Sequence, residues 1–400
     1  MHILFLSQVL PYPLDAGPKM RSYFVLRYLA QQHEVTLLTF VRATDRPEAL
    51  VHLAEFCQTI CAVPMQRSWL RDVRFLTQSL LTQKPFLILR DHVPSMAAKI
   101  GELVKAKHFD VIHADQLWMA PYALIAQKEL PQAKLVLDQH NAVYLIPQRL
   151  AEATSNLVKQ HFLAGEARRL MAFEPEICHR FDHVVWVTAE DFKAVNALSS
   201  PFSNGYPPST IIPISANPTE IQPLKRSGEK YRITFLGGLH WPPNAQGILW
   251  FAEHVFPLVR TQIPEALLTI IGKSPPTELG GEGIEVTGYV VDPLPYLAET
   301  AVFIVPLHAG GGMRVKILDA WSWGLPVVST TVGAEGINVE HEKNILQADT
   351  SQAFAEAIVR IFRSPLLAQK LGENGRQTVV EQYNWQRVYT TWDKIYADLV

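Results

Sequence analysis

The feature that most constrains this chain is a regular alternation of short apolar runs with longer, helix-like segments. In the first half the runs are HILFLSQ at 2–8, EVTLLTFV at 34–41, FDVIHAD at 109–115, AKLVLDQHN at 133–141 and DHVVWVT at 182–188. Uninterrupted apolar runs are typical of strands that are buried on both faces of a parallel sheet. A helical pattern over residues 20–31 joins the first two runs. The alternation therefore predicts an α/β fold with a doubly wound parallel sheet.

The alternation stops between residues 206 and 231, where Pro, Ser, Asn and Lys dominate, and then begins again. The later runs are YRITFLGGL at 231–239, LLTIIGKSPP at 267–276, IEVTGYV at 284–290, AVFIVPLHAGG at 301–311 and GLPVVSTTVG at 324–333. Because 400 residues exceed one ordinary core, we expect two Rossmann-like domains. Residues 1–212 form the first, 213–230 a linker and 231–383 the second.

Composition excludes several classes of function. Hydrophobic residues make up 48% and charged residues 18%, as in globular proteins. A formal charge of -2 is not that of a nucleic-acid-binding protein, so we expect no nucleic-acid partner. Three cysteines give no disulfide framework. No apolar run reaches the roughly 18 residues that span a bilayer, and the first residues lack signal-peptide features, so we expect a cytoplasmic location.

Glycines follow four strands of the second half, and one group is a triplet. Gly310, Gly311 and Gly312 precede a helix that we expect to begin near Met313. Free main-chain amides and the positive end of a helix dipole form an anion site. Arg314 and Lys316 add positive charge, although a helix would point them to different faces. The segment therefore predicts a diphosphate site. Asp319, farther along this helix, is either an exposed charge or a ligand of ribose hydroxyls.

The segment VPLHAGGGMRVKILDAWSWGLPVVSTTVGAEGI resembles the donor site of glycosyltransferase family four, the retaining GT-B enzymes. The resemblance extends over nearly the whole chain, through FLGGLHWPPNAQGILWF, VTGYVVDPLPYLAETAVFIVPL, PYPLDAGPKMRSYFVLRYLAQQHEVTLLT, DQHN and EQYNWQRVYTTW. The first two of these segments resemble those of a branch of cell-wall or exopolysaccharide sugar transferases. The resemblance implies two Rossmann-like domains that face each other across a cleft, with a last helix at about 384–400 returning to the first domain.

The resemblance also implies roles at the donor side. Asp319 matches the second acid of the family's E-x7-E motif, which binds ribose, whereas Gly311 stands where the first acid would be. The family's two diphosphate-binding cations fall near Gly238 and Asn244, so Arg314 and Lys316 are the expected replacement charge. The remaining donor-side candidates are the loop residue Gly17, His240 and Gly272 with Lys273, the base-cradling Tyr289 and Val290, and Gly310, Gly312 and Met313.

On the acceptor side, His140 lies at the end of the run 133–141, at a position where the family often has an active-site histidine. His113, which we place at the end of the preceding strand, is a second candidate, and Asn141 lies next to His140. Asp138 is expected to orient this loop or His140. A satisfied structural role is the alternative for either histidine.

These assignments predict a glycosyltransferase that moves a sugar from a nucleotide-sugar donor, UDP- or GDP-linked, to a glycan, lipid-linked or small-molecule acceptor. The family's chemistry implies retention of configuration, and the absence of a D-x-D pair favours catalysis without metal. We expect no cofactor. The alternatives are a nucleotide-sugar 2-epimerase of the same architecture and a catalytically weak nucleotide-sugar-binding protein of a polysaccharide locus.

The segment RSWLRDVRFLTQSLLTQKPFLILR at 67–90 mixes arginines, Trp69 and leucines, as interfacial helices do. A solvated helix face over core residues is the alternative reading. If the segment contacts lipid, the protein binds peripherally at the inner face of the membrane and a lipid-linked acceptor becomes attractive.

Overall fold

The computed structural model describes residues 1–65, 67–198, 206–225 and 231–399, and it divides into two compact units. Unit 1 comprises residues 1–215 and 386–400, and unit 2 comprises residues 216–385. These limits lie close to the expected ones at 212 and 384. Residues 226–230 of the expected linker lie outside the described part of the chain.

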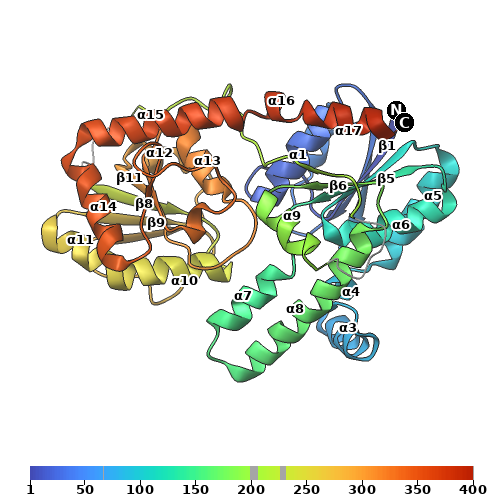
Figure 1. The fold of residues 1–400 in the computed structure, drawn as a ribbon, viewed down its shortest axis with the longest axis horizontal. Helices are drawn as coiled ribbons and strands as arrows, with labels where there is room; N and C mark the ends of the chain where they lie inside the picture. Colours follow the sequence, from blue (N-terminus) through green and yellow to red (C-terminus); the bar gives the residue numbers. More distant parts are fainter. Residues whose placement is uncertain (66, 199–205, 226–230, 400) are drawn as a thin grey trace. The chain divides into compact units, whose positions relative to one another are not determined.

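Unit 1 is built on a seven-stranded sheet (Figure 1). Every recorded strand pairing in it is parallel, and the strand order is β3-β2-β1-β4-β5-β6-β7. Its strands are β1 (His2–Ser7), β2 (Glu34–Val41), β3 (Thr59–Pro64), β4 (Val111–Asp115), β5 (Lys134–Gln139), β6 (His183–Trp186) and β7 (Ser209–Ile211). Its helices are α1 (Gly17–Leu29), α2 (Glu48–Leu53), α3 (Trp69–Thr82), α4 (Phe86–Arg90), α5 (Pro94–Ala106), η1 (Leu117–Met119), α6 (Ala120–Glu129), α7 (Leu145–Ala153), α8 (Leu157–Cys178), α9 (Ala189–Asn196) and α17 (Thr391–Leu399), with α16 (Trp385–Val388) at the boundary.

Side chains of β1 alternate between the two faces of this sheet. Leu4 and Leu6 join an apolar core with residues of α5 and α6. Phe5, between them, stacks on the ring of His113, and Tyr396 of α17 hydrogen-bonds that histidine. Both faces are therefore covered by helices, as the uninterrupted apolar runs predict.

Unit 2 is built on a six-stranded sheet, also parallel at every recorded pairing, in the order β10-β9-β8-β11-β12-β13. Its strands are β8 (Arg232–Leu236), β9 (Leu267–Ile271), β10 (Ile284–Gly288), β11 (Val302–Val305), β12 (Val327–Ser329) and β13 (Leu346–Gln347). Its helices are α10 (Pro242–Trp250), η2 (Phe251–Val255), α11 (Phe256–Gln262), α12 (Leu294–Ala298), α13 (Val315–Ser322), η3 (Val332–Ala334), α14 (Ser351–Arg363) and α15 (Pro365–Gln382).

Two helix starts differ from the sequence expectations. The first helix begins at Gly17 rather than near Met20, so Gly17 is a helical residue and not part of the preceding loop. The helix after the glycine triplet begins at Val315, with Arg314 as its N-terminal flanking residue, rather than near Met313. In the part of the chain that the structure describes, no helix is both long enough and apolar enough to cross a membrane.

Each sheet has one point where the direction of strand addition reverses. In unit 1 this switch lies between β1 and β4, and in unit 2 it lies between β8 and β11. Open α/β sheets bind ligands at the carboxyl ends of the strands beside such a switch. The loops after these four strands are therefore the places to look for a site.

Candidate functional site

In unit 2, the loops after β8 and β9 lie tightly against each other. The amide of Gly237 donates to the carbonyl of Ile271 (2.9 Å), and the amide of Leu239 donates to the carbonyl of Lys273 (2.9 Å). A Cβ on Gly272 would overlap the carbonyl oxygen of Gly237, so only glycine permits this approach. Gly238 lies under the ring of the exposed His240.

The glycine triplet after β11 forms a loop that is held by Arg314. Gly310 and Gly312 have φ values of 132° and 68°, in the region that favours glycine. The buried guanidinium of Arg314 folds back and donates to the carbonyls of Gly311 and Gly312, the latter at 2.9 Å. It also lies 3.5 Å from a carboxylate oxygen of Glu335. This geometry indicates that Arg314 shapes the loop, whereas the sequence reading made it a diphosphate ligand.

Lys316 points from the first turn of α13 to the end of β8. Its Nζ donates to Oδ1 of Asn244 (2.8 Å), and Asn244 in turn donates to the carbonyl of Gly238 (2.8 Å). The same Nζ lies 4.5 Å from the centroid of the Phe235 ring. A Cβ on Gly237 would come within 2.8 Å of this amine, so the glycine leaves room for it. The ammonium group therefore lies beside the first turn of α10, next to Gly238 and Asn244, where the family resemblance leads us to expect cations.

Lys316 and Asp319 have strongly shifted pKa values. Burial lowers the pKa of Lys316 to about 7, and the charge of Arg314 acts in the same direction. Burial raises the pKa of Asp319 to about 7, partly offset by the charge of Lys316. Both side chains are partly buried. Asp319 is therefore not a fully exposed charge. No hydrogen-bond partner of its side chain is recorded among the described residues.

The other predicted donor residues lie around these loops. Lys273 is exposed, and its Nζ lies 4.5 Å from the ring centroid of Tyr289, which is itself exposed. Val290 is half-buried next to Tyr289, and Met313 is buried within the loop of the triplet. Thus the structure gathers these residues at the carboxyl edge of one sheet, within unit 2. Gly17, by contrast, belongs to unit 1.

In unit 1, His140 is held by Asp115 at the carboxyl ends of β5 and β4. Nε2 of His140 lies 2.9 Å from Oδ1 of Asp115, and both residues are buried. The other oxygen of Asp115 accepts from Ser7 (2.9 Å) and Ser22 (2.7 Å). Burial alone would raise the pKa of Asp115, but His140 and Ser22 lower it below the ordinary value. An ionised Asp115 accepts the Nε2 proton, so Nδ1 of His140 is the atom left for a ligand.

Asp138 does not orient His140 directly. Its two oxygens accept hydrogen bonds from Nε and a terminal nitrogen of Arg21, each at 2.9 Å, in a pair that is fully buried. Arg21 also donates to the carbonyl of Pro213 (2.9 Å). Asp138 lies 3.8 Å from Nε2 of His140, beyond hydrogen-bond range. Asp138 therefore binds α1 to the sheet.

The expectation for His113 is wrong in position. It lies in the middle of β4, not at its end, and its side chain faces α17. Nδ1 lies 2.8 Å from the hydroxyl of Tyr396, and the ring stacks on Phe5 at 4.4 Å. Burial lowers the pKa of His113 to about 4, so it is neutral at pH 7. His113 therefore has the structural role that was its alternative reading. Asn141 is half-buried in the turn after β5, beside His140.

Two residues that sequence reasoning missed, Asp115 and Gln116, follow one another at the end of β4. Gln116 has φ 74° and ψ 158°, a conformation that is costly for any residue except glycine. It is 4% exposed, and its side-chain NH₂ has no hydrogen-bond partner among the described residues. Nδ1 of His140 likewise has no hydrogen-bond partner among the described residues. Both atoms lie on residues that follow the carboxyl ends of β4 and β5, where a ligand would satisfy them.

Asp115, Asp138 and His140 are also residue types that bind metals, and their ligand atoms lie within 4.8 Å of one another. Both oxygens of Asp138 are taken by Arg21, however, and Nε2 of His140 by Asp115. The guanidinium already supplies the balancing positive charge. These contacts favour a hydrogen-bonded network over a metal centre.

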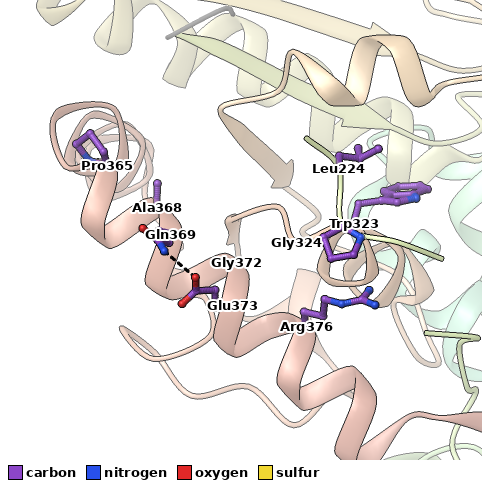
Figure 2. Close-up of a pocket in the computed structure, with 10 residues that line it drawn as sticks. Leu224, Trp323, Gly324, Pro365, Ala368, Gln369, Gly372, Glu373 and Arg376 are labelled. Atoms are coloured by element: carbon purple, nitrogen blue, oxygen red, sulfur yellow. Dashed lines mark hydrogen bonds between the residues drawn. The ribbon is translucent and has the colours of Figure 1, made fainter. Parts of the chain in front are cut away.

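A cavity of about 390 Å³ lies elsewhere in unit 2 (Figure 2). It is lined by α15 and by residues that include Leu224 and Trp323, and none of its described lining residues is a predicted donor residue. Its most polar wall residue, Arg376, donates to the carbonyls of Pro218 and Ile221, each at 3.0 Å. Arg376 thus fixes the segment that enters unit 2, and the cavity is not the candidate site.

The two parallel α/β sheets, each with its switch point, define the GT-B fold of glycosyltransferases. Residues 230–364 match the family described as glycosyl transferases group 1. That part of the chain, which carries the glycine loops and Lys316, is therefore a group 1 glycosyltransferase domain.

Known relatives agree with this class. An uncharacterised 44.6 kDa protein of the cps region of Klebsiella pneumoniae is 21% identical over 97% of this chain and 98% of its own length. The lipopolysaccharide core biosynthesis glycosyltransferase LpsE of Rhizobium meliloti is 30% identical over 30% of this chain and 36% of its own. The structure of Anabaena Alr3699/HepE in complex with UDP-glucose has the same fold, with a TM-score of 0.67 at 15% identity and full coverage of both chains.

Proposed function

We propose that this chain transfers a sugar from a nucleoside diphosphate donor, UDP- or GDP-linked, to a glycan, lipid-linked or small-molecule acceptor. Transfer proceeds with retention of configuration and without a metal ion. The observation that carries this proposal is the position of the Lys316 ammonium group, beside Gly237 and the first turn of α10 at the switch point of unit 2. A diphosphate is stabilised by an ammonium group in this position and by the positive end of a helix dipole.

The chemistry explains why the charge must be in place before reaction. The bond between the anomeric carbon and the phosphate oxygen breaks, and negative charge grows on the leaving diphosphate. Preorganised donors that stabilise this charge lower the barrier. In transfer with retention, the acceptor oxygen attacks from the face that the diphosphate leaves, and its proton passes to the departing phosphate oxygen. Lys316 and the loop amides after β11 then stabilise that oxygen.

We assign hydroxyl positioning to the network of unit 1. Asp115 fixes the orientation and tautomer of His140, and Nδ1 accepts a hydrogen bond from a substrate hydroxyl. The NH₂ of Gln116 donates to a second substrate oxygen. The names of similar proteins support a role in polysaccharide assembly, because they include a lipopolysaccharide core glycosyltransferase and a protein of a cps region.

A donor hydrolysis assay tests this proposal without knowledge of the acceptor. Incubation with UDP-glucose, UDP-N-acetylglucosamine or GDP-mannose should release free sugar and nucleoside diphosphate slowly, with and without EDTA. Proton NMR of the first sugar released should show the anomer of the donor. Tight donor binding without any turnover would instead indicate a binding protein, and an epimerised nucleotide sugar would indicate a 2-epimerase.

Lys316→Met is the variant that tests the central residue. We expect about 10- to 100-fold weaker donor binding, because one charge-assisted contact is lost. The matched control is Lys343→Met, an exposed lysine paired with Glu340 in the same unit, which should bind donor like the wild type.

A further inference from the structure

The structure leaves a broad apolar surface uncovered in unit 1. On α3 the side chains of Trp69, Leu70, Val73, Leu80 and Leu81 are 55–81% exposed. On the first turns of α8, three more large apolar side chains, Leu157, Val158 and Phe162, are 40–82% exposed. We call these eight residues the α3–α8 face. It contains more than half of the large apolar side chains recorded as exposed in the described chain, so exposed apolar area is concentrated on these two helices.

The apolar side chains of α3 follow one stripe of the helix. Leu70, Val73 and Leu80 recur at the spacing that places residues on the same side. Ser79, on the opposite side, is buried, and Phe75 is partly buried there. The helix therefore packs on unit 1 through its other side, and its most apolar stripe faces away from the rest of unit 1.

Specific contacts hold α8 against α4, the short helix that follows α3. Glu166 of α8 accepts hydrogen bonds from the amides of Phe86 (3.0 Å) and Leu87 (2.8 Å), which begin α4 directly after α3. The rings of Phe86 and Phe162 lie 6.1 Å apart. In Figure 1, α3 and α8 project from unit 1 on the side where α4 also lies. The face is thus a preformed part of unit 1.

Positive charge surrounds this apolar stripe. Five arginines and lysines and two aspartates lie between residues 67 and 91, whereas the whole chain has a formal charge of -2. One of the aspartates, Asp91, is buried and already paired with Arg67 at 2.8 Å. Arg74 and Lys84 are exposed, and Lys159 lies on α8 between Val158 and Phe162.

We propose that the α3–α8 face docks the protein on an anionic lipid surface. The apolar stripe enters the boundary between headgroups and acyl chains, and the flanking cations contact lipid phosphates. Apolar area combined with basic residues is what peripheral membrane helices use, since neither alone gives firm binding. A protein partner would account for the apolar stripe but would leave the excess of cations without a role.

The face is also anchored to the predicted acceptor edge of unit 1. Asp91 accepts a hydrogen bond from the side chain of Gln8 (2.7 Å), and Gln8 directly follows β1. Docking would therefore hold the edge that carries Asp115 and His140 near the bilayer, where a lipid-linked acceptor is presented. This consequence rests on the proposed function, whereas the docking itself does not.

Vesicle co-sedimentation of the full chain tests the proposal without any nucleotide sugar. We expect retention on vesicles of phosphatidylcholine with one third phosphatidylglycerol to exceed retention on phosphatidylcholine alone by at least about tenfold. Leu70→Ser with Leu81→Ser should lower it by about tenfold, and so should Arg74→Glu with Lys84→Glu. All four side chains are exposed, so the variants should fold normally by circular dichroism.

The matched controls change equally exposed residues of unit 2. Val291→Ser with Leu366→Ser removes two apolar side chains that are about 80% exposed, and Lys370→Glu reverses an exposed charge. These variants should sediment like the wild type. Absence of wild-type retention on the anionic vesicles, or equal loss in the controls, would overturn the proposal. So would concentration-dependent dimerisation that the α3 variants abolish in a protein that does not bind vesicles. None of these results would affect the donor-site assays.

Discussion

Lys316 supplies positive charge at Asn244, although the two residues lie on different helices. The side chain of Asn244 is uncharged, and the ammonium group of Lys316 reaches it from α13, 2.8 Å from its Oδ1. Gly237 makes this possible by leaving the space empty. Arg314, two residues earlier in the sequence, donates hydrogen bonds to carbonyls of its own loop. At this scale the donor site depends on which of two neighbouring cations is free to meet the ligand.

The pKa of Lys316 leads to a prediction about pH. Burial lowers that pKa to about 7 in the free protein, and a bound diphosphate favours the charged form. Above pH 7 the terminal phosphate of UDP is ionised, so binding must be accompanied by proton uptake at Lys316. The affinity for UDP should therefore fall as pH rises from 7 to 9, by up to about tenfold per unit. Isothermal titration calorimetry at several pH values measures this directly.

Lys316→Arg is the informative comparison for the pH dependence. A guanidinium group stays charged over this range, so the fall in affinity between pH 7 and pH 9 should nearly disappear. An equally steep fall in the arginine variant would show that another group is responsible.

Gln116 provides a second residue-scale prediction, which concerns stability and function together. Its φ of 74° with ψ of 158° suits glycine and strains every other residue. Gln116→Gly should therefore be more stable than Gln116→Ala by about 1–3 kcal/mol in the free energy of unfolding. Urea denaturation measures the difference. Both variants should hydrolyse donor and transfer sugar more slowly than the wild type. If alanine were as stable as glycine, the backbone at this position would be unstrained.

At the scale of elements, the donor loops depend on how α13 packs against α15. A Cβ on Gly375 of α15 would overlap the indole of Trp321, a fully buried side chain of α13. The helices therefore approach more closely than any larger residue allows. Since Lys316 lies on the first turn of α13, this packing also sets where its ammonium group lies.

Gly375→Ala tests the importance of this contact. Overpacking should lower the free energy of unfolding by about 1–3 kcal/mol. Gly101→Ala is the matched control, because Gly101 lies within α5 and a Cβ there would meet no atom within 4 Å. That exchange should raise stability by about 0.5–1 kcal/mol, through the better helix propensity of alanine. A neutral result at Gly375 would mean that α13 can shift away without cost.

For the whole molecule, the sequence was informative about the sheets because the signal is local. Uninterrupted apolar runs and the helical segments between them predict parallel strands one unit at a time, and both sheets follow this pattern. The glycine triplet likewise predicts a special loop, which the positive φ values of Gly310 and Gly312 explain. These features require no knowledge of distant contacts.

The errors and omissions concern strand ends and distant contacts. An apolar run does not show at which residue its strand ends, so the prediction placed His113 at the end of β4, whereas it lies in the middle of that strand. The Asp115–His140 pair exists because β4 and β5 are neighbours, which the strand order decides. The residue type at position 116, glutamine, gives no indication of its unusual backbone conformation. Asp115 could have been found by inspecting the last residue of each apolar run that lies beside a switch point.

The most direct test of the donor site is a crystal structure of the full chain with UDP or GDP bound. We predict that the diphosphate lies within hydrogen-bond distance of Nζ of Lys316 and of main-chain amides of the loop after β11, with the loop after β8 beside it. A nucleotide bound with its diphosphate remote from Lys316 and from both loops would contradict the account.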